Sequence, residues 1–235
     1  MDNVFKWRHF ECSIILQCVR WYLKYGISYR DLSEMMAERG VDICHTTIYR
    51  WVMKYSHELK KRARWYARDH GSSWQVDETY VKVKGQWKYL YRVIDKNGDT
   101  IDFYLSHTRN SKAAKRFLGK ALKLNKHWVP RVINTDKNPA YNQAIADLKT
   151  ENESYSHMEH RKVKYLNNRI ESDHGKLKRL IKPMLGFKTM KSANATITGY
   201  EFMRMFKKGQ FDFWLEHKRM NEVQFINNLF GVYAA

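Results

Sequence analysis

The stretch from Lys164 to Lys178 carries side chains whose types and spacing could do chemistry. Its apolar residues recur at the period of an α-helix, and they are Leu166, Ile170, Leu177 and Ile181. On that helix Glu171, His174 and Lys178 are three and then four positions apart, so an acid, an imidazole and a cation share the neighbouring polar face. The stretch is therefore either a solvated helix face or one wall of a catalytic site.

Two aspartates elsewhere in the chain favour the catalytic interpretation. Asp77 lies in a run rich in β-branched and aromatic residues, from Trp74 to Val81, and Asp136 ends the short apolar run 132–135. Aspartate is depleted in strands and is rarely buried without a partner. Two such strands, followed by a helix that carries Glu171, predict carboxylates that converge on a metal. Three carboxylates can hold two Mg²⁺ ions about 4 Å apart for in-line phosphoryl transfer on nucleic acid.

The order and spacing of these residues match a known acidic triad. Asp77, Asp136 and Glu171 resemble the triad of the DDE transposases and retroviral-type integrases, because 34 residues separate Asp136 from Glu171 and a basic residue, Lys178, follows seven positions later. The motifs that resemble the insertion-sequence six family of bacterial transposases are Asp77-Glu78-Thr79-Tyr80, Lys82-Val83-Lys84-Gly85, Trp87-Lys88-Tyr89-Leu90-Tyr91-Arg92, and Lys164-Tyr165-Leu166-Asn167-Asn168 leading into Ile170-Glu171 and Asp173-His174.

The resemblance implies a ribonuclease-H-like fold, in which the first strand, the fourth strand and a late helix bring the carboxylates together. It implies that Asp77, Asp136 and Glu171 are catalytic and ligate two Mg²⁺ or Mn²⁺ ions. One ion would lower the pKa of the attacking water or 3′-hydroxyl, and the other would stabilise the leaving oxygen. It also implies that the protein binds terminal inverted repeats, cuts 3′ ends and joins them to target DNA as replicative cointegrates. Pairing two transposon ends implies at least a dimer.

Other polar residues near the triad are expected to play supporting parts. Lys178 would hold a phosphate of the transposon end. The residues expected to contact DNA or to support the site are Asn167, Asn168, Asp173 and His174, with plain helix surface as the alternative. Glu78 alternates to the opposite side of the strand from Asp77, so we do not count it as a ligand. Asp173 is the main competitor of Glu171, and the 34-residue gap favours Glu171.

Composition limits the partners of this chain of 235 residues. A formal net charge of +19 is the electrostatic footprint of a polyanion binder, with nucleic acid as the first partner and an anionic membrane as the second. No apolar run approaches the ~18 residues needed to span a bilayer, and the N-terminus lacks a signal-peptide pattern. The cysteines, Cys12, Cys18 and Cys44, match no zinc spacing. We expect a reduced, cytoplasmic bacterial protein associated with the nucleoid or a plasmid.

The N-terminal pattern predicts a helix-turn-helix module. Helices are expected over 12–25 and 29–39, the second capped by Ser28, and a third helix is capped near Thr46 or Thr47. Two helices, a turn and a basic third helix fit a module whose recognition helix enters the major groove, although an ordinary three-helix packing unit shows the same pattern. The residues best placed for DNA contact are Thr46, Thr47, Tyr49, Arg50 and Lys54.

The remaining pattern is of the α/β (α+β) class. Strands are predicted over 74–81, 87–94, 101–105, 131–135 and 155–158, and helices over 111–124, from Pro139, around Glu171 and over 192–208. Antiparallel strands followed by alternating helices and strands indicate a mixed sheet flanked by helices. The expected domains are 1–68 for the helix-turn-helix domain, 69–206 for the catalytic core and 207–235 for an aromatic tail. We expect the tail in a core or dimer interface, with a nucleic-acid stacking platform as the alternative.

Three other classes of protein fit part of the pattern. A transcriptional regulator would use the helix-turn-helix alone. A ribonuclease-H-like nuclease would share the triad but would lack strand-transfer activity, and an inactive relative would only bind DNA. Joining of a cut 3′ end to target DNA separates a transposase from all three.

Overall fold

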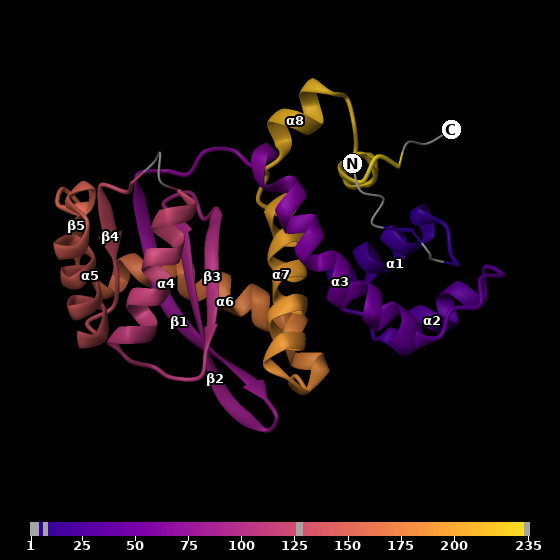
Figure 1. The fold of residues 1–235 in the computed structure, drawn as a ribbon, viewed down its shortest axis with the longest axis horizontal. Helices are drawn as coiled ribbons and strands as arrows, with labels where there is room; N and C mark the ends of the chain where they lie inside the picture. The colour runs from indigo at the N-terminus through magenta and orange to yellow at the C-terminus, as the bar shows by residue number, and fades with distance from the viewer. Residues whose placement is uncertain (1–4, 7–8, 126–128, 233–235) are drawn as a thin grey trace. The chain divides into compact units, whose positions relative to one another are not determined.

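The chain forms two compact units (Figure 1). The computed structural model describes residues 5–6, 9–125 and 129–232. The first unit joins the chain up to Arg68 to the chain from Lys191 onward, and the second runs from Asp69 to Met190. The predicted catalytic core, 69–206, begins at the same boundary but extends beyond the second unit by most of one helix. The limits of the functional domains stay a prediction.

Three helices open the first unit, as the sequence predicts. They are α1 (Cys12–Tyr25), α2 (Tyr29–Ala37) and α3 (His45–Ala63). Gly26 ends α1 in the left-handed conformation, with φ of 65°, and Ser28 forms a capping box with Asp31 at the start of α2. The N-cap of α3 is Cys44, two residues before the predicted Thr46. A shift of this size is ordinary for helix ends.

The C-terminal chain completes the first unit. Its elements are α7 (Met190–Lys207), α8 (Asp212–His217) and α9 (Glu222–Leu229), and a 3₁₀ helix, η1 (Arg64–Tyr66), follows α3. At Gly199 in α7 an added Cβ atom would lie 2.4 Å from the Leu23 side chain, so only glycine allows this close approach to α1. Phe211 and Phe225 are buried with ring centroids 5.2 Å apart. These aromatic residues of the tail therefore belong to a core.

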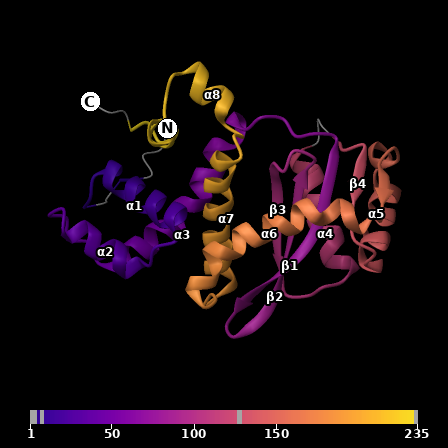
Figure 2. The same ribbon diagram turned by 180° about the vertical axis from the view of Figure 1, so that it is seen from behind.

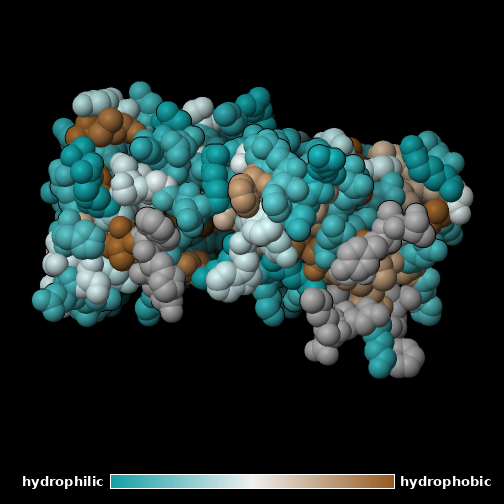
Figure 3. All heavy atoms as spheres, turned by 90° about the horizontal axis from the view of Figure 1, so that it is seen from above, coloured by the Kyte–Doolittle hydropathy of each residue, from teal (hydrophilic) through white to brown (hydrophobic). Residues whose placement is uncertain are grey.

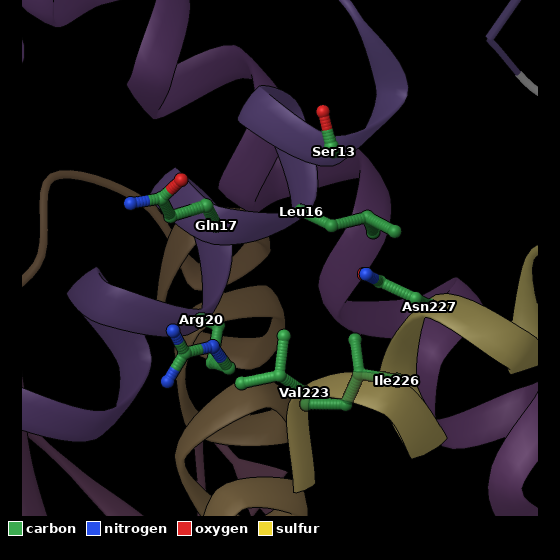
Figure 4. A pocket seen from close by; sticks show the side chains of 7 residues that line it. All are labelled: Ser13, Leu16, Gln17, Arg20, Val223, Ile226 and Asn227. Carbon is green, nitrogen blue, oxygen red and sulfur yellow. The ribbon is translucent and has the colours of Figure 1, made fainter. Parts of the chain in front are cut away.

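A hollow lies between α1 and α9 of this unit (Figure 4). The residues that line it are Ser13, Leu16, Gln17, Arg20, Val223, Ile226 and Asn227. Beside it Lys24 on α1 pairs with Glu222 on α9 at 2.8 Å. This ion pair holds the last helix against the first.

The second unit is built on a five-stranded mixed sheet in the order β3-β2-β1-β4-β5. The strands are β1 (Ser73–Val83), β2 (Gln86–Asp95), β3 (Thr100–Ser106), β4 (Val132–Asn134) and β5 (Glu159–Arg161). The first three pair antiparallel, whereas β4 runs parallel to β1 and β5 parallel to β4. Lys84 and Gly85 both have positive φ, as a tight turn between β1 and β2 requires. This strand order is that of the ribonuclease-H-like fold, which confirms the predicted fold class.

Helices cover both faces of the sheet (Figures 1 and 2). The helical elements are α4 (Ser111–Leu124), α5 (Pro139–Glu151), η2 (Glu153–Tyr155), η3 (Lys164–Asn167), α6 (Asn168–Ile181) and η4 (Lys182–Met184). Helices α4 and α5 bury one face, where Trp74, Val76 and Phe117 belong to the main core, and α6 crosses the other. Helix α5 begins at Pro139, as predicted, and Asn138 is its N-cap.

The strand predicted over 155–158 is wrong in its position. Asn152 accepts a hydrogen bond from the Ser154 backbone N–H at 3.0 Å and starts the 3₁₀ helix η2, and β5 follows only at Glu159–Arg161. The sequence here has no alternating apolar pattern. Pairing with β4, which no local pattern encodes, fixes the strand instead.

One face of the described chain is largely polar. Hydrophilic residues dominate the face drawn in Figure 3, and the hydrophobic residues visible there are scattered in small groups. Among the described residues no helix combines the length and apolar character that crossing a membrane requires.

Candidate active site

The parallel register of β1 and β4 places two aspartates side by side. Gln75 lies opposite Asn134, and Asp77 and Asp136 each follow two residues later. Because side chains alternate with a period of two along extended chain, both aspartates point to the same side. Asp136 Oδ1 accepts the backbone N–H of Asn138 at 3.0 Å, which holds the carboxylate in the turn. Carboxylate oxygens of the two aspartates lie within 4.8 Å of each other.

Glu78 joins this acidic group, contrary to our expectation. One of its carboxylate oxygens lies within 4.8 Å of those of both aspartates. Glu78 leaves β1 on the face opposite to Asp77, where its partner Tyr141 shares a core with Val76, and the pairing of β1 with β4 has already ended at Gln75. The Arg109 guanidinium and the Tyr141 hydroxyl each donate to one of its oxygens. Glu78 therefore adds charge to the group while both its oxygens are already bonded.

Burial and crowded negative charge raise the pKa of Asp77 to about 7. Burial is the largest cause, and the charge of Glu78 comes next. The backbone hydrogen bond of Glu78 acts in the opposite direction, and the charges of Asp136 and Glu171 add to the rise. His174 Nδ1 lies 3.6 Å from Asp77 Oδ2. A carboxyl group shifted this far by burial and like charges is typical of a functional site, and a bound cation would relieve the repulsion.

Glu171 acts on this group from α6. It is exposed in the first turn of the helix, and its charge contributes to the raised pKa of Asp77. Among the described residues, the carboxylates that gather at metal-ligand spacing are those of Asp77, Glu78 and Asp136. The structure thus brings two of the three predicted catalytic residues together and leaves the third within electrostatic range.

Asp173, the competitor of Glu171, has another partner. Its Oδ2 atom lies 2.5 Å from Nη2 of Arg92 on β2, and both side chains are buried. In the β1–β2 register Arg92 lies opposite Asp77, so the pair joins α6 to the sheet directly beside the acidic group. Removing either partner of such a buried pair leaves an uncompensated charge. We therefore interpret Asp173 as an anchor of α6 and Glu171 as the carboxylate that α6 offers to the site.

A buried amide pair fixes the start of α6. Asn134 Nδ2 donates to Asn167 Oδ1 at 2.6 Å, and Asn167 Nδ2 donates to the carbonyl oxygen of Val76 at 3.4 Å. Asn167 thus connects both aspartate-bearing strands to the helix that carries Glu171.

The predicted DNA contacts divide by exposure. Those with exposed or partly exposed side chains are Thr46, Thr47, Tyr49, Arg50 and Lys54 on α3, and Asn168 and Lys178 on α6. Asn167 and His174 are buried, so in this structure they contact the residues of the site and are not open to DNA.

Four residues at the site were not singled out from the sequence. They are Arg92, Asn134, Arg109 and Tyr141. Arg92 lies in a motif that resembles the family, but no role at the site was predicted for it, and no motif contains the other three, because each reaches the site only through strand register or helix packing. For Arg92 the signal was its place in a strand opposite Asp77, which requires the register of the hairpin.

Two solved structures are similar to part of this chain. The catalytic core domain of HTLV-2 integrase in complex with magnesium has a TM-score of 0.43 and 23% identity, over 57% of this chain and 84% of that one. The catalytic core domain of BIV integrase has a TM-score of 0.45 and 15% identity, over 63% of this chain and 97% of that one.

A ribonuclease-H-like sheet with one aspartate on its first strand and another just after its fourth is the architecture of metal-dependent polynucleotidyl transferases. A family model described as the DDE domain matches residues 71–210. Transposases of two Staphylococcus aureus elements, IS431mec and IS257 in transposon Tn4003, are each 35% identical over 214 residues, which is 88% of this chain and 91% of each relative. The chain belongs to the DDE transposases of the insertion-sequence six family.

Proposed function

We propose that this transposase binds the terminal inverted repeats of its element, cleaves their 3′ ends and joins them to target DNA. Asp77, Asp136 and Glu171 are its catalytic residues. The observation that carries the proposal is the approach of Asp77 and Asp136 to within 4.8 Å, just past the point where the parallel pairing of β1 and β4 ends, with the charge of Glu171 acting on the same group.

The donor set fits hard divalent cations. Carboxylate oxygens are the ligands that Mg²⁺ and Mn²⁺ prefer. Asp173 and Glu78 are already bonded to arginine and tyrosine side chains, so Asp77, Asp136 and Glu171 would hold two ions. Bound there, such cations supply Lewis acidity toward the attacking and leaving oxygens of an in-line displacement.

Two displacements at phosphorus follow one another in the proposed reaction. In the first, water forms a bond to phosphorus while the bond from phosphorus to the 3′ oxygen of the transposon end breaks. In the second, that 3′-hydroxyl forms a bond to a target phosphorus and displaces a target 3′ oxygen. His174, 3.6 Å from Asp77, orients that carboxylate, and Lys178, seven positions after Glu171 on α6, holds a phosphate of the transposon end.

Exposed residues of α3 supply recognition of the terminal repeat. Those that we assign to it are Thr46, Thr47, Tyr49, Arg50 and Lys54. Asn168 contacts DNA from the first turn of α6, while Asn167 and His174 act from behind the site. Because two transposon ends must be joined together, the active form is at least a dimer. The product is a replicative cointegrate, made in the bacterial cytoplasm on nucleoid or plasmid DNA.

Cleavage and joining of a labelled terminal-repeat DNA test this proposal. The wild-type protein and Asp136→Asn are compared with Mg²⁺ and with chelator, and 3′-end release and transfer to a plasmid are followed beside repeat binding. We expect metal-dependent joining by the wild-type protein only, with equal repeat binding by both. Asn keeps the shape of the side chain, so retained binding separates lost chemistry from lost structure.

Other outcomes identify the alternatives. Repeat binding without cleavage or joining would make the protein a DNA-binding regulator. Metal-dependent cleavage without joining would make it a ribonuclease-H-like nuclease. Equal joining by Asp136→Asn would remove Asp136 from the catalytic residues.

A further inference from the structure

The β1–β2 hairpin runs past the rest of the sheet (Figure 1). Pairing of β1 with β4 ends at Gln75, and pairing of β2 with β3 ends at Tyr89. From there to the turn the two strands pair with each other, and near the turn Phe187 occupies the outer edge of β1. Backbone bonds of 2.8 Å join Phe187 to Lys82 and Lys84. No further strand can therefore pair with that edge of β1. A partner would have to bind one of the two faces of the hairpin instead.

One face of the hairpin is apolar and buried, and the other carries exposed aromatic rings. Val81 and Val83 are buried, whereas Tyr80 is 45% and Trp87 62% exposed. The Tyr80 ring centroid lies 6.4 Å from that of Trp87 and 5.4 Å from that of Tyr89. We call Tyr80, Trp87 and Tyr89 the aromatic platform. Exposed aromatic residues in contact mark an interaction site more strongly than a single exposed ring does.

The charge around the platform selects a polyanion. From Thr79 to Ile94 the chain contains four basic residues and no acidic one. Lys82 and Lys84 are exposed beside the rings. If a second copy of the chain docked on this face with its own platform, the lysines of the two copies would lie opposite one another and repel. A DNA strand offers phosphates to the lysines and flat base faces to the aromatic rings.

The platform lies on the approach to the acidic group. Tyr80 is two residues beyond Glu78 on the same face of β1, which is the face opposite to Asp77, and the Glu78 carboxylate within 4.8 Å of Asp77 and Asp136 connects that face to the acidic group. Trp87 is opposite Lys82, four residues beyond Glu78, which is about 13 Å along a strand. The rings therefore lie within a few nucleotides of the reacting phosphate, where a base that has left its pairing partner can stack on them.

We infer that the aromatic platform stacks unpaired bases of the DNA strand that enters the active site, so that the protein prefers DNA whose end is opened. The inference rests on the proposed function, because it takes the acidic group as the place of reaction. The occupant is a nucleobase with its neighbouring phosphates, held by rings and lysines together.

Binding in chelator tests the inference without any reaction. Two DNAs carry the same terminal repeat, one fully paired and one with mismatched bases next to the cleavage point, and a fluorescent base analogue reports stacking at that position. We expect the wild-type protein to bind the mismatched DNA more tightly. Trp87→Ala should weaken binding to mismatched DNA by about 5- to 150-fold, the range of one base–aromatic stack, with little change on paired DNA.

Two further variants test whether the aromatic face of Trp87 itself causes the preference. Trp87→Phe keeps an aromatic face and should retain most of the preference. Trp65→Ala removes an 81% exposed tryptophan beside Arg64 in the other unit, and should change neither binding nor the fluorescence of the base. Because Trp87 is exposed, its replacement should leave the circular dichroism spectrum of the protein unchanged.

Several results would overturn the inference. They are equal binding of both DNAs by the wild-type protein, an equal loss on both DNAs in Trp87→Ala, and a Trp87→Ala protein that loses its dimer in sedimentation. Failure of the proposed function would give a different result. A wild-type protein that prefers the mismatched DNA but shows no metal-dependent joining would support base stacking by the platform and contradict the proposed transposition chemistry.

Discussion

At the scale of single residues, the partners that the fold provides distinguish chemically identical carboxylates. Asp173 is held by Arg92, and Glu78 accepts bonds from Arg109 and Tyr141. A buried anion with such partners is stable as part of the structure. Asp77 instead lies among other carboxylates, and its pKa is raised to about 7. The fold therefore keeps an electrostatic repulsion at the site that metal binding can relieve.

This difference predicts unequal effects of two conservative substitutions. Glu171→Gln should reduce joining to background, because it removes a proposed ligand. Glu78→Gln should reduce joining by roughly 10- to 100-fold, the usual cost of losing a residue that supports a metal ligand. Initial rates of 3′-end joining at saturating Mg²⁺ measure both.

Tyr141→Phe is the matched control, since it removes only one donor to Glu78 and keeps the ring in the core. We expect it to cost less activity than Glu78→Gln. If Glu78→Gln were inactive and Glu171→Gln retained substantial joining, Glu78 would be the third ligand.

Removing the charge of Asp77 should stabilise the metal-free protein in a pH-dependent way. Folding raises this pKa from its usual 3.8 to about 7. Between these values the folded protein keeps a proton that the unfolded chain has released, so the free energy of unfolding falls as the pH rises. The destabilisation is complete above pH 7 and absent below the unfolded value. Asp77→Asn should therefore gain most stability over the wild-type protein at pH 8 and little near pH 4.

Urea unfolding in chelator at these two pH values measures the difference. Saturating Mg²⁺ should reduce the advantage of the variant at pH 8, because metal binding stabilises only the folded wild-type protein. An Asp77→Asn protein that is less stable than the wild type at pH 8 in chelator would contradict the argument.

At the scale of elements, α6 is positioned by contacts between its buried residues and the sheet. The amide of Asn167 joins its start to β1 and to Asn134 at the end of β4, and the buried Arg92–Asp173 pair joins it to β2. These contacts fix the helix against the strands that carry the aspartates. Misplacement of a catalytic group by about 1 Å can cost 100-fold in rate, so we expect activity to depend on residues that never touch DNA.

Asn167→Ala tests this dependence. The change leaves the buried amide of Asn134 with fewer partners, which should cost about 1–3 kcal/mol of unfolding free energy and reduce joining. Binding of the terminal repeat by α3 should remain. Asn168→Ala, at the exposed neighbouring position, is the control and should be as stable as the wild-type protein. Equal stability of the two variants would show that the amide pair contributes nothing to holding α6.

At the scale of the whole molecule, a net charge of +19 gives any DNA a favourable approach. Release of counterions makes such binding steeply dependent on salt and largely independent of sequence. Specificity must then come from a few residues that reach base edges, and the first turns of α3 present the exposed candidates.

Arg50→Ala should therefore reduce the preference for the terminal repeat over unrelated DNA. If Arg50 instead contacts a phosphate, binding should weaken on both DNAs and the salt slope should fall by about 1. Lys123→Ala removes an equal charge from the exposed end of α4 and should leave the preference unchanged. Fluorescence anisotropy at several salt concentrations measures both quantities, and unchanged binding in Arg50→Ala would exclude it from the interface.

The sequence by itself determined the local elements of this protein. Capping residues such as Ser28 and Asn138, the turn at Lys84 and Gly85, and apolar periodicity act within a few positions, so their structural consequences can be read from the chain. The spacing from Asp136 to Glu171 resembled a known family, and the comparisons confirmed that family. The catalytic roles of these residues stay a prediction.

Only the tertiary structure decided which polar groups meet. The place of β5, the arrival of Glu78 beside the aspartates and the partners Arg92, Arg109 and Tyr141 all depend on contacts between distant segments. Alternation along β1 correctly predicted that Glu78 leaves the strand on the face opposite to Asp77, where Tyr141 donates to it, but it did not show that the Glu78 carboxylate lies within 4.8 Å of both aspartates. The parallel pairings of β4 with β1 and of β5 with β4 join segments that are distant in the sequence, so no local pattern contains their register.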